Sequence, residues 1–145
     1  MSDTVYNAEL LRLAADAAGA GRLAKPDASA TLNNPACGDC ITMDLGLQNG
    51  RITALGHQTH ACILTQASAA ILAMAAIGAT RAELEALAEG VRSFLKGGTV
   101  PARPFGAYGA FAAAGVHPGR HVCVLLPLQA ALEALEVSEL AEPRA

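Results

Sequence analysis

The spacing of apolar residues changes after His60, and this change limits the fold more than any other feature. From Ile41 to Leu47, apolar residues alternate with polar or small ones, which is the period of a half-buried strand. Asn49-Gly50 favours a tight type I′ turn, and Arg51 to Gln58 returns as a second strand. After His60 the spacing becomes helical. The chain therefore predicts an antiparallel hairpin followed by helices, an α+β fold.

Two helices are expected within residues 62–95. Cys62 to Ile77 is apolar on nearly every side, which is typical of a buried helix, and Gly78 ends it. Thr80-Arg81-Ala82-Glu83 has the form of a capping box, because a threonine at the N-cap is followed three positions later by a glutamate. This box predicts an amphipathic helix that runs to about Leu95.

The N-terminal third is expected to hold one helix and the start of the sheet. Tyr6 to Leu23 is mostly helical by its apolar stripe, and Gly19-Ala20-Gly21 is expected to end the helix. Lys25 to Thr31 suits a linker or a short edge strand. Asn33-Asn34-Pro35 predicts a turn, because proline excludes the helical conformation at the preceding residue. All strands are expected within residues 28–58.

The C-terminal third is expected to combine a loop with one helix. Lys96 to Gly119 is rich in glycine and proline, which predicts a long and mobile surface excursion with one short helix around Tyr108 to Ala114. A final helix is expected over Val124 to Val137. Pro127 would clash with the carbonyl of Cys123 inside a regular helix, so we expect the regular helix to begin after Cys123.

Composition and charge limit the possible partners. A chain of 145 residues can bury one core, so a single domain over residues 1–145 is expected. The net charge is −3 without a basic stripe, which does not support nucleic-acid binding. The most apolar stretch, Ala67 to Ala79, is shorter than the about 20 residues needed to cross a bilayer, and the first residues lack a secretory pattern. We therefore expect a cytoplasmic protein without a membrane partner.

The four cysteines carry most of the chemical information. Thiols stay reduced in the cytosol, where they serve more often as ligands or reactive groups than as disulfides. Cys37 and Cys40 precede the first clear strand, while Cys62 and Cys123 lie where helices are expected to start. A helix N-terminus lowers the pKa of a thiol, so lowered values are expected at these two residues. Three thiolates with the oxygen of Asp39 suit Zn²⁺, Fe²⁺ or a small iron-sulfur cluster.

Several residues near the cysteines have more than one interpretation. The Cys37-x-x-Cys40 pair also fits a redox motif, although no helix follows it. Cys40 alone fits a small buried hydrophobe or an incidental exposed thiol. His60 and His121 each precede a cysteine by two positions, so each is either a fourth ligand or a surface or structural residue. Arg120 is a candidate partner of the carboxylate or of a cluster sulfide, or a solvated charge.

Three segments carry a resemblance to a known family. Asn34-Pro35-Ala36-Cys37-Gly38-Asp39 resembles the NPxCGD signature of the U-type iron-sulfur cluster assembly scaffolds, which comprise IscU, the NifU N-terminal domain and SufU. Ala61-Cys62-Ile63-Leu64-Thr65-Gln66-Ala67-Ser68-Ala69 is similar to the GCxIxxASA segment of that family. Arg120-His121-Val122-Cys123-Val124-Leu125-Leu126 resembles the third-cysteine segment of the SufU branch, RxxCxxL. The long gap between the last two segments also resembles SufU.

The resemblance implies a fold, a function and partners. The implied fold is a small three-stranded antiparallel sheet with helices packed on it. The implied ligands of iron or a [2Fe-2S] cluster are Cys37, Asp39, Cys62 and Cys123. Such a scaffold is a carrier rather than a turnover enzyme, and it passes its cluster to apo acceptor proteins or other SUF-type components.

The resemblance also implies an alternative with zinc. In that alternative the protein is a SufU-like sulfur acceptor that works with a cysteine desulfurase, and Cys123 is the candidate persulfide carrier. A zinc ion that only holds the fold together is a third interpretation. The chain shows Ala14-Ala15-Asp16-Ala17-Ala18-Gly19 where the family has a tyrosine- and histidine-containing stretch, so the desulfurase-docking motif is atypical.

Overall fold

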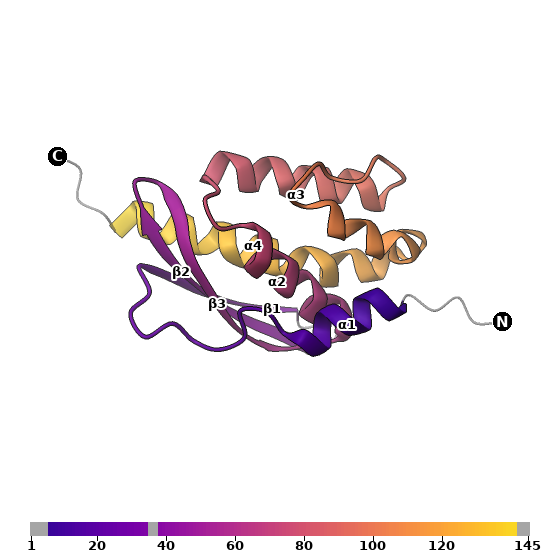
Figure 1. Ribbon diagram of the computed structural model, residues 1–145, viewed down its shortest axis with the longest axis horizontal. Helices are drawn as coiled ribbons and strands as arrows, with labels where there is room; N and C mark the ends of the chain where they lie inside the picture. The colour runs from indigo at the N-terminus through magenta and orange to yellow at the C-terminus, as the bar shows by residue number, and fades with distance from the viewer. Residues whose placement is uncertain (1–5, 35–37, 142–145) are drawn as a thin grey trace.

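The computed structural model describes residues 6–34 and 38–141, and in it helices cover one face of a three-stranded antiparallel sheet (Figure 1). The elements in chain order are α1 (Ala8–Asp16), β1 (Ala28–Asn34), β2 (Asp39–Gln48), β3 (Arg51–His60), α2 (Ile63–Ala75), α3 (Arg81–Leu95), the 3-10 helix η1 (Gly106–Val116) and α4 (Pro118–Ala141). The strands lie in the order β1-β2-β3. Helices α2 and α4 pack on the sheet, and α3 packs on α4 from the other side. The predicted α+β fold is confirmed.

Strands β2 and β3 form the predicted hairpin. Asn49 and Gly50 have φ angles of 54° and 77°, and two positive angles are what a type I′ turn requires. Alternation along β2 places every second side chain against the helices, and these residues are Asp39, Ile41, Met43 and Leu45, all of them buried. Asp39 is the polar member of this row, and it lies at the end of the strand.

Strand β1 continues further than the sequence predicts. Asn33 and Asn34, expected in a turn, are strand residues that pair with Cys40 and Asp39 of β2. The chain turns just before β2, where Gly38 has a φ of 75° and its N–H donates to the carbonyl of Asn34 over 2.8 Å. The restriction that proline places on its predecessor excludes a helix, but an extended strand satisfies it equally well.

Helix α1 is shorter than the predicted helix over residues 6–23. It ends at Asp16, and Ala17 takes a left-handed conformation with a φ of 50°. The next residues run along the free edge of β3, where the N–H of Gly21 donates to the carbonyl of His57 over 2.7 Å and the N–H of His57 donates to Gly19 over 3.0 Å. A Cβ atom at Gly19 would overlap a side chain of α2. The apolar stripe predicted a longer helix. The helix ends at Asp16 because the following residues extend to pair with the edge of β3.

Helices α2 and α3 begin as predicted. Cys62 is the N-cap of α2, and α2 is buried along most of its length. The capping box of α3 is complete, because Thr80 Oγ1 accepts from the N–H of Glu83 over 3.2 Å and the Glu83 carboxylate accepts from the N–H of Thr80 over 2.8 Å. Local spacing and capping chemistry therefore predicted both helix starts.

The short helix expected around Tyr108 to Ala114 is present as η1, but its expected surface position is wrong, because η1 packs into the core. Tyr108, Phe111 and Ala114 of η1 are each 0% exposed. A 3-10 helix has three residues per turn, so a side chain at every third position faces the core. The hydroxyl of Tyr108 also lies 2.9 Å from that of Ser68 in α2. The sequence analysis followed the Gly/Pro-rich composition and did not identify this three-residue spacing.

Helix α4 begins earlier than predicted and contains Pro127 in its interior. Cys123 therefore lies inside the helix rather than before it. Its carbonyl would normally accept from the N–H of residue 127, which proline lacks. The hydroxyl of Thr65 in α2 donates to this carbonyl over 2.9 Å, and Ser68 donates to the carbonyl of Val124 over 2.7 Å. Side-chain hydroxyls of α2 thus make the proline acceptable inside a helix.

By length and composition alone, the stretch Pro118–Glu139 of α4 could cross a membrane. More than half of this stretch is buried, and α4 packs against β1, β2, α2 and α3. A core helix of this kind has the same composition as a membrane span, so the composition is weak evidence for one.

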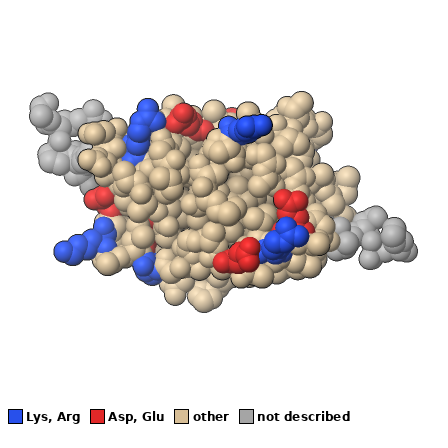
Figure 2. Space-filling model, in the orientation of Figure 1, with Lys and Arg blue, Asp and Glu red and all other residues tan. Residues whose placement is uncertain are grey.

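On the face shown in Figure 2, acidic and basic side chains are scattered among uncharged ones and form no basic stripe.

Candidate metal centre

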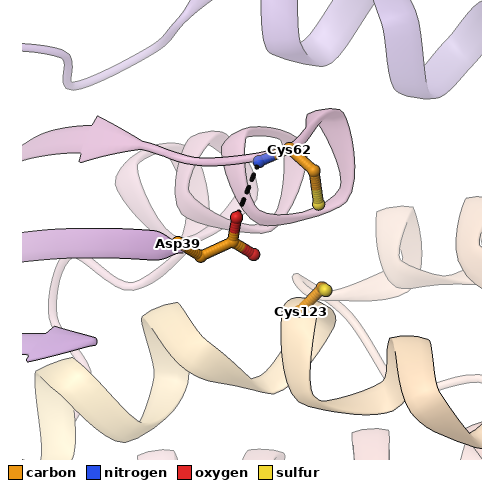
Figure 3. A group of neighbouring side chains, drawn as sticks. All are labelled: Asp39, Cys62 and Cys123. Carbon is orange, nitrogen blue, oxygen red and sulfur yellow. Dashed lines mark hydrogen bonds between the residues drawn. The ribbon is translucent and has the colours of Figure 1, made fainter. Parts of the chain in front are cut away.

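Side chains from three elements converge at one end of the sheet (Figure 3). Asp39 begins β2, Cys62 caps α2, and Cys123 lies in the second turn of α4. One carboxylate oxygen and the two sulfur atoms lie within 4.8 Å of one another. Asp39 and Cys123 are buried, and Cys62 is half-buried. The fold thus brings together three residues that the sequence singled out.

Of the other two cysteines, only Cys40 lies within the described residues. Cys37, the fourth expected ligand, lies outside the described residues. Cys40 follows Asp39 in β2, so its side chain points to the opposite face of the sheet, and it pairs with His60 of β3. Among the described residues, the cluster of metal-ligand types holds neither Cys40 nor His60.

The carboxylate of Asp39 is oriented by the start of α2. Its Oδ1 accepts from the N–H of Cys62 over 3.3 Å (Figure 3). Its Oδ2 lies 3.3 Å from the hydroxyl of Thr65. The first N–H groups of a helix lack intrahelical partners and form the positive end of its dipole, so a carboxylate is favoured there. Asp39 of the sheet therefore caps the start of α2, where the side chain of the N-cap residue Cys62 makes no capping hydrogen bond.

The thiol of Cys123 differs from the sequence expectation. Burial is the largest cause that raises its pKa, to about 12, and the neighbouring Cys62 adds to the rise. The expected lowering is wrong because Cys123 lies within α4 and not at its N-terminus, where free N–H groups would stabilise a thiolate. The thiol is therefore protonated at neutral pH in the absence of a metal, and a metal must displace its proton.

Arg120 lies beside both thiols. Its guanidinium donates to the hydroxyl of Tyr6 over 2.9 Å and stacks over that ring, with 5.7 Å from Cζ to the ring centroid. The hydrogen bond to Tyr6 raises the pKa of Arg120 most, and hydrogen bonds to Cys62 and Cys123 raise it further. Among the described residues its partners are therefore a tyrosine and the two thiols, whereas the sequence left open the carboxylate, a cluster sulfide or solvent.

His121 has a structural contact rather than a place in the cluster. Its Nε2–H donates to the carbonyl of Gly115 over 3.0 Å, which ties the start of α4 to the end of η1. Sequence reasoning missed Thr65, whose hydroxyl reaches both Asp39 and the backbone of Cys123. The available signal was a polar residue in a helix that is otherwise apolar on nearly every side.

The donor set fits a thiophilic metal ion or an iron-sulfur cluster. Thiolates favour Zn²⁺ and iron, and a carboxylate oxygen completes many such sites. Tetrahedral zinc bonds of about 2.0–2.3 Å separate neighbouring ligand atoms by roughly 3.3–3.8 Å. The observed spread within 4.8 Å is close to that range, so small side-chain rotations suffice to bind an ion. Three donors leave at least one coordination position for a further ligand.

Comparisons with known proteins agree with this site. Residues 5–112 match the NifU-like N terminal domain family, a range that includes Cys37, Asp39 and Cys62 and ends before Cys123. The iron-sulfur cluster assembly scaffold protein IscU of Streptococcus pyogenes serotype M1 is 30% identical over 112 residues, which cover 77% of this chain and 70% of that protein.

Solved structures share the fold over nearly the whole chain. A nitrogen-fixing NifU-like protein (N-terminal) from Brucella abortus is 32% identical with a TM-score of 0.89, over 95% of this chain and 96% of that one. A candidate iron-sulfur cluster assembly scaffold for the SUF system of Fervidobacterium islandicum AW-1 has a TM-score of 0.84 at 21% identity, over 93% and 99% of the two chains. At that identity the second likeness shows the fold alone.

Proposed function

This chain belongs to the NifU-like N-terminal domain family of iron-sulfur cluster assembly scaffolds, and we propose that it builds a [2Fe-2S] cluster, or holds iron, on Cys37, Asp39, Cys62 and Cys123. It then passes the cluster to apo acceptor proteins or other SUF-type components in the cytoplasm. The observation that carries the proposal is the convergence of one carboxylate oxygen and two sulfurs within 4.8 Å, from elements far apart in the sequence.

The thiols are the strong ligands of the cargo. Only the thiolate binds iron, so cluster assembly releases protons, among them that of the buried Cys123. Thiolates and bound sulfide add negative charge, which the guanidinium of Arg120 offsets because it lies near both thiols. The half-buried side chain of Cys62 leaves the site accessible from one side for delivery and release.

Asp39 is the ligand suited to release. A carboxylate is a harder ligand than a thiolate, so an acceptor thiolate displaces it more readily from iron. When displaced, the carboxylate stays near the N–H of Cys62, which already donates to it. This arrangement favours transfer over permanent storage of the cluster.

Metal and sulfide analysis after anaerobic purification tests the proposal. Reconstitution with iron and a sulfur source is expected to yield equal amounts of iron and acid-labile sulfide, with thiolate-to-iron charge-transfer absorption, and the cluster is expected to move to an apo acceptor. One tightly bound zinc ion and no cluster after reconstitution would contradict the scaffold function.

A zinc-containing sulfur acceptor is the second candidate function. It is favoured by Arg120, because a guanidinium against two thiols also stabilises an anionic persulfide. The acceptor thiolate, with Cys123 as the candidate, attacks the terminal sulfur of the desulfurase persulfide. One S–S bond forms as the other breaks, and the desulfurase thiolate leaves. Since Cys123 is 3% exposed, the site must open for this step.

The second candidate has its own assay. Zinc-loaded protein added to a cysteine desulfurase is expected to raise the rate of alanine formation, and mass spectrometry is expected to find one added sulfur atom on a cysteine. Unchanged alanine formation would contradict sulfur transfer, and a bound zinc ion would then only stabilise the fold.

A further inference from the structure

We propose that Thr65 is a positioning residue of the metal centre, whose hydroxyl aligns Asp39 and Cys123 toward Cys62. The inference deepens the proposed function and rests on it, because it assumes that these three side chains bind a metal ion. It assigns to one buried hydroxyl the task of holding ligands from three separate elements in one arrangement.

The contacts of the Thr65 hydroxyl carry the inference. Its side chain is 0% exposed, in the first turn of α2. Its Oγ1 lies 2.9 Å from the carbonyl oxygen of Cys123, 3.3 Å from Oδ2 of Asp39 and 3.8 Å from Sγ of Cys62. One hydroxyl thus contacts all three ligand residues, which come from β2, α2 and α4.

Pro127 explains why the carbonyl of Cys123 needs this hydroxyl. A proline has no N–H, so the carbonyl four residues earlier loses its usual helical donor. A buried carbonyl without a donor is unfavourable, and Thr65 supplies the donor from a neighbouring helix. The bond fixes the backbone of Cys123, and so the direction from which its sulfur enters the site.

The second contact acts on the carboxylate. A hydroxyl has one proton, and that of Thr65 is shared between the carbonyl of Cys123, at 2.9 Å, and Oδ2 of Asp39, at 3.3 Å. A carboxylate keeps free lone pairs beside such a bond, and these remain available to a metal ion. Hydrogen bonds to metal ligands commonly orient them, and their removal weakens metal binding by about 10–100-fold.

Ser68 provides a matched control. It lies on the same side of α2, is 0% exposed, and donates to the carbonyl of Val124 over 2.7 Å. Its other partner among the described residues is Tyr108 of η1, and neither partner is a proposed ligand. Loss of the Ser68 hydroxyl therefore removes a comparable helix-to-helix hydrogen bond without touching the ligand side chains.

The test compares metal affinity with fold stability in four variants: Thr65→Val, Thr65→Ala, Thr65→Ser and Ser68→Ala. Affinity for Zn²⁺ and Co²⁺ is measured by competition with a chromophoric chelator, and the thiolate-to-Co²⁺ absorption reports the ligand arrangement. Melting of the metal-free protein reports the fold. We expect Thr65→Val and Thr65→Ala to bind both ions about 10–100-fold more weakly, with an altered Co²⁺ spectrum. Thr65→Ser is expected to stay within about threefold of wild type, because it keeps the hydroxyl.

Ser68→Ala is expected to melt at a lower temperature but to bind metal within about threefold of wild type. If Thr65→Val melts lower yet binds metal as wild type does, Thr65 only holds the helices together and the inference is wrong. The inference is equally wrong if Ser68→Ala loses as much affinity as Thr65→Val. If Thr65→Val does not fold, Thr65→Ala decides by the same comparison. Wild-type protein that binds neither ion would instead overturn the proposed function.

Discussion

Replacement of Phe111 by alanine tests whether η1 belongs to the core. The ring is 0% exposed and lies against Tyr108, with 5.5 Å between the ring centroids. Truncation of a fully buried phenylalanine leaves a cavity and costs about 3–5 kcal/mol of unfolding free energy. Small domains are stable by about 5–15 kcal/mol in total, so this one change removes a large share. At about 2–4 °C per kcal/mol, the melting temperature is expected to fall by roughly 6–20 °C.

Equilibrium urea unfolding measures this loss, and Val116→Ala is the control. Val116 belongs to the same 3-10 helix, but its side chain is 73% exposed, so its truncation is expected to change stability by less than about 0.5 kcal/mol. A loss below about 1.5 kcal/mol for Phe111→Ala would refute the reasoning, because a truncated core aromatic costs more than that. Residues 96–119 would then form the surface excursion that their composition predicts.

Three further predictions concern the site and the sheet edge. Cys62→Ser and Cys123→Ser are each expected to weaken Zn²⁺ binding at least about tenfold, while Cys40→Ser, on the other face of β2, is expected to bind as wild type does. Competition with a chromophoric chelator measures the affinity. Loss of binding in Cys40→Ser alone would favour a CxxC site. Asp39→Ala is expected to keep or lengthen the lifetime of a reconstituted cluster and to slow its transfer to an apo acceptor. Unchanged transfer with a lowered melting temperature would show that Asp39 only caps α2. Burial lowers the pKa of His57 below 6.5, so the unfolded chain takes up this proton at a higher pH than the folded one. The stability contribution of neutral His57 is therefore complete above pH 6.5 and declines as the pH falls below it, and urea midpoints at pH 7.5 and 5.5 should differ less in His57→Gln than in wild type.

The elements that could be predicted from the sequence depend on neighbours close along the chain. The turn at Asn49-Gly50, the capping box at Thr80 and the buried character of α2 follow from local conformational preference and from spacing. The structure agrees with these predictions almost to the residue. The errors lie where distant contacts override local preference, as at Gly19 and Gly21, which cover the edge of β3 rather than end a longer helix.

The segment η1 and helix α4 show a second kind of error. Glycine and proline predicted irregular surface structure for η1, yet Tyr108 reaches the core and binds Ser68. Pro127 predicted a late start for α4, yet the hydroxyl of Thr65 replaces the missing donor. In both cases a polar side chain of α2, distant in sequence, makes a hydrogen bond that the local composition does not predict.

The amino-acid sequence by itself determined the chemistry of the candidate site, because thiols and a carboxylate at Asp39, Cys62 and Cys123 select for zinc or iron wherever they meet. Only the tertiary structure decided that these three groups meet, since they come from β2, α2 and α4. It also decided their environment: burial within α4, rather than a helix N-terminus, raises the pKa of Cys123. Solvation and the pairing of distant elements are properties of the folded chain, and local patterns do not contain them.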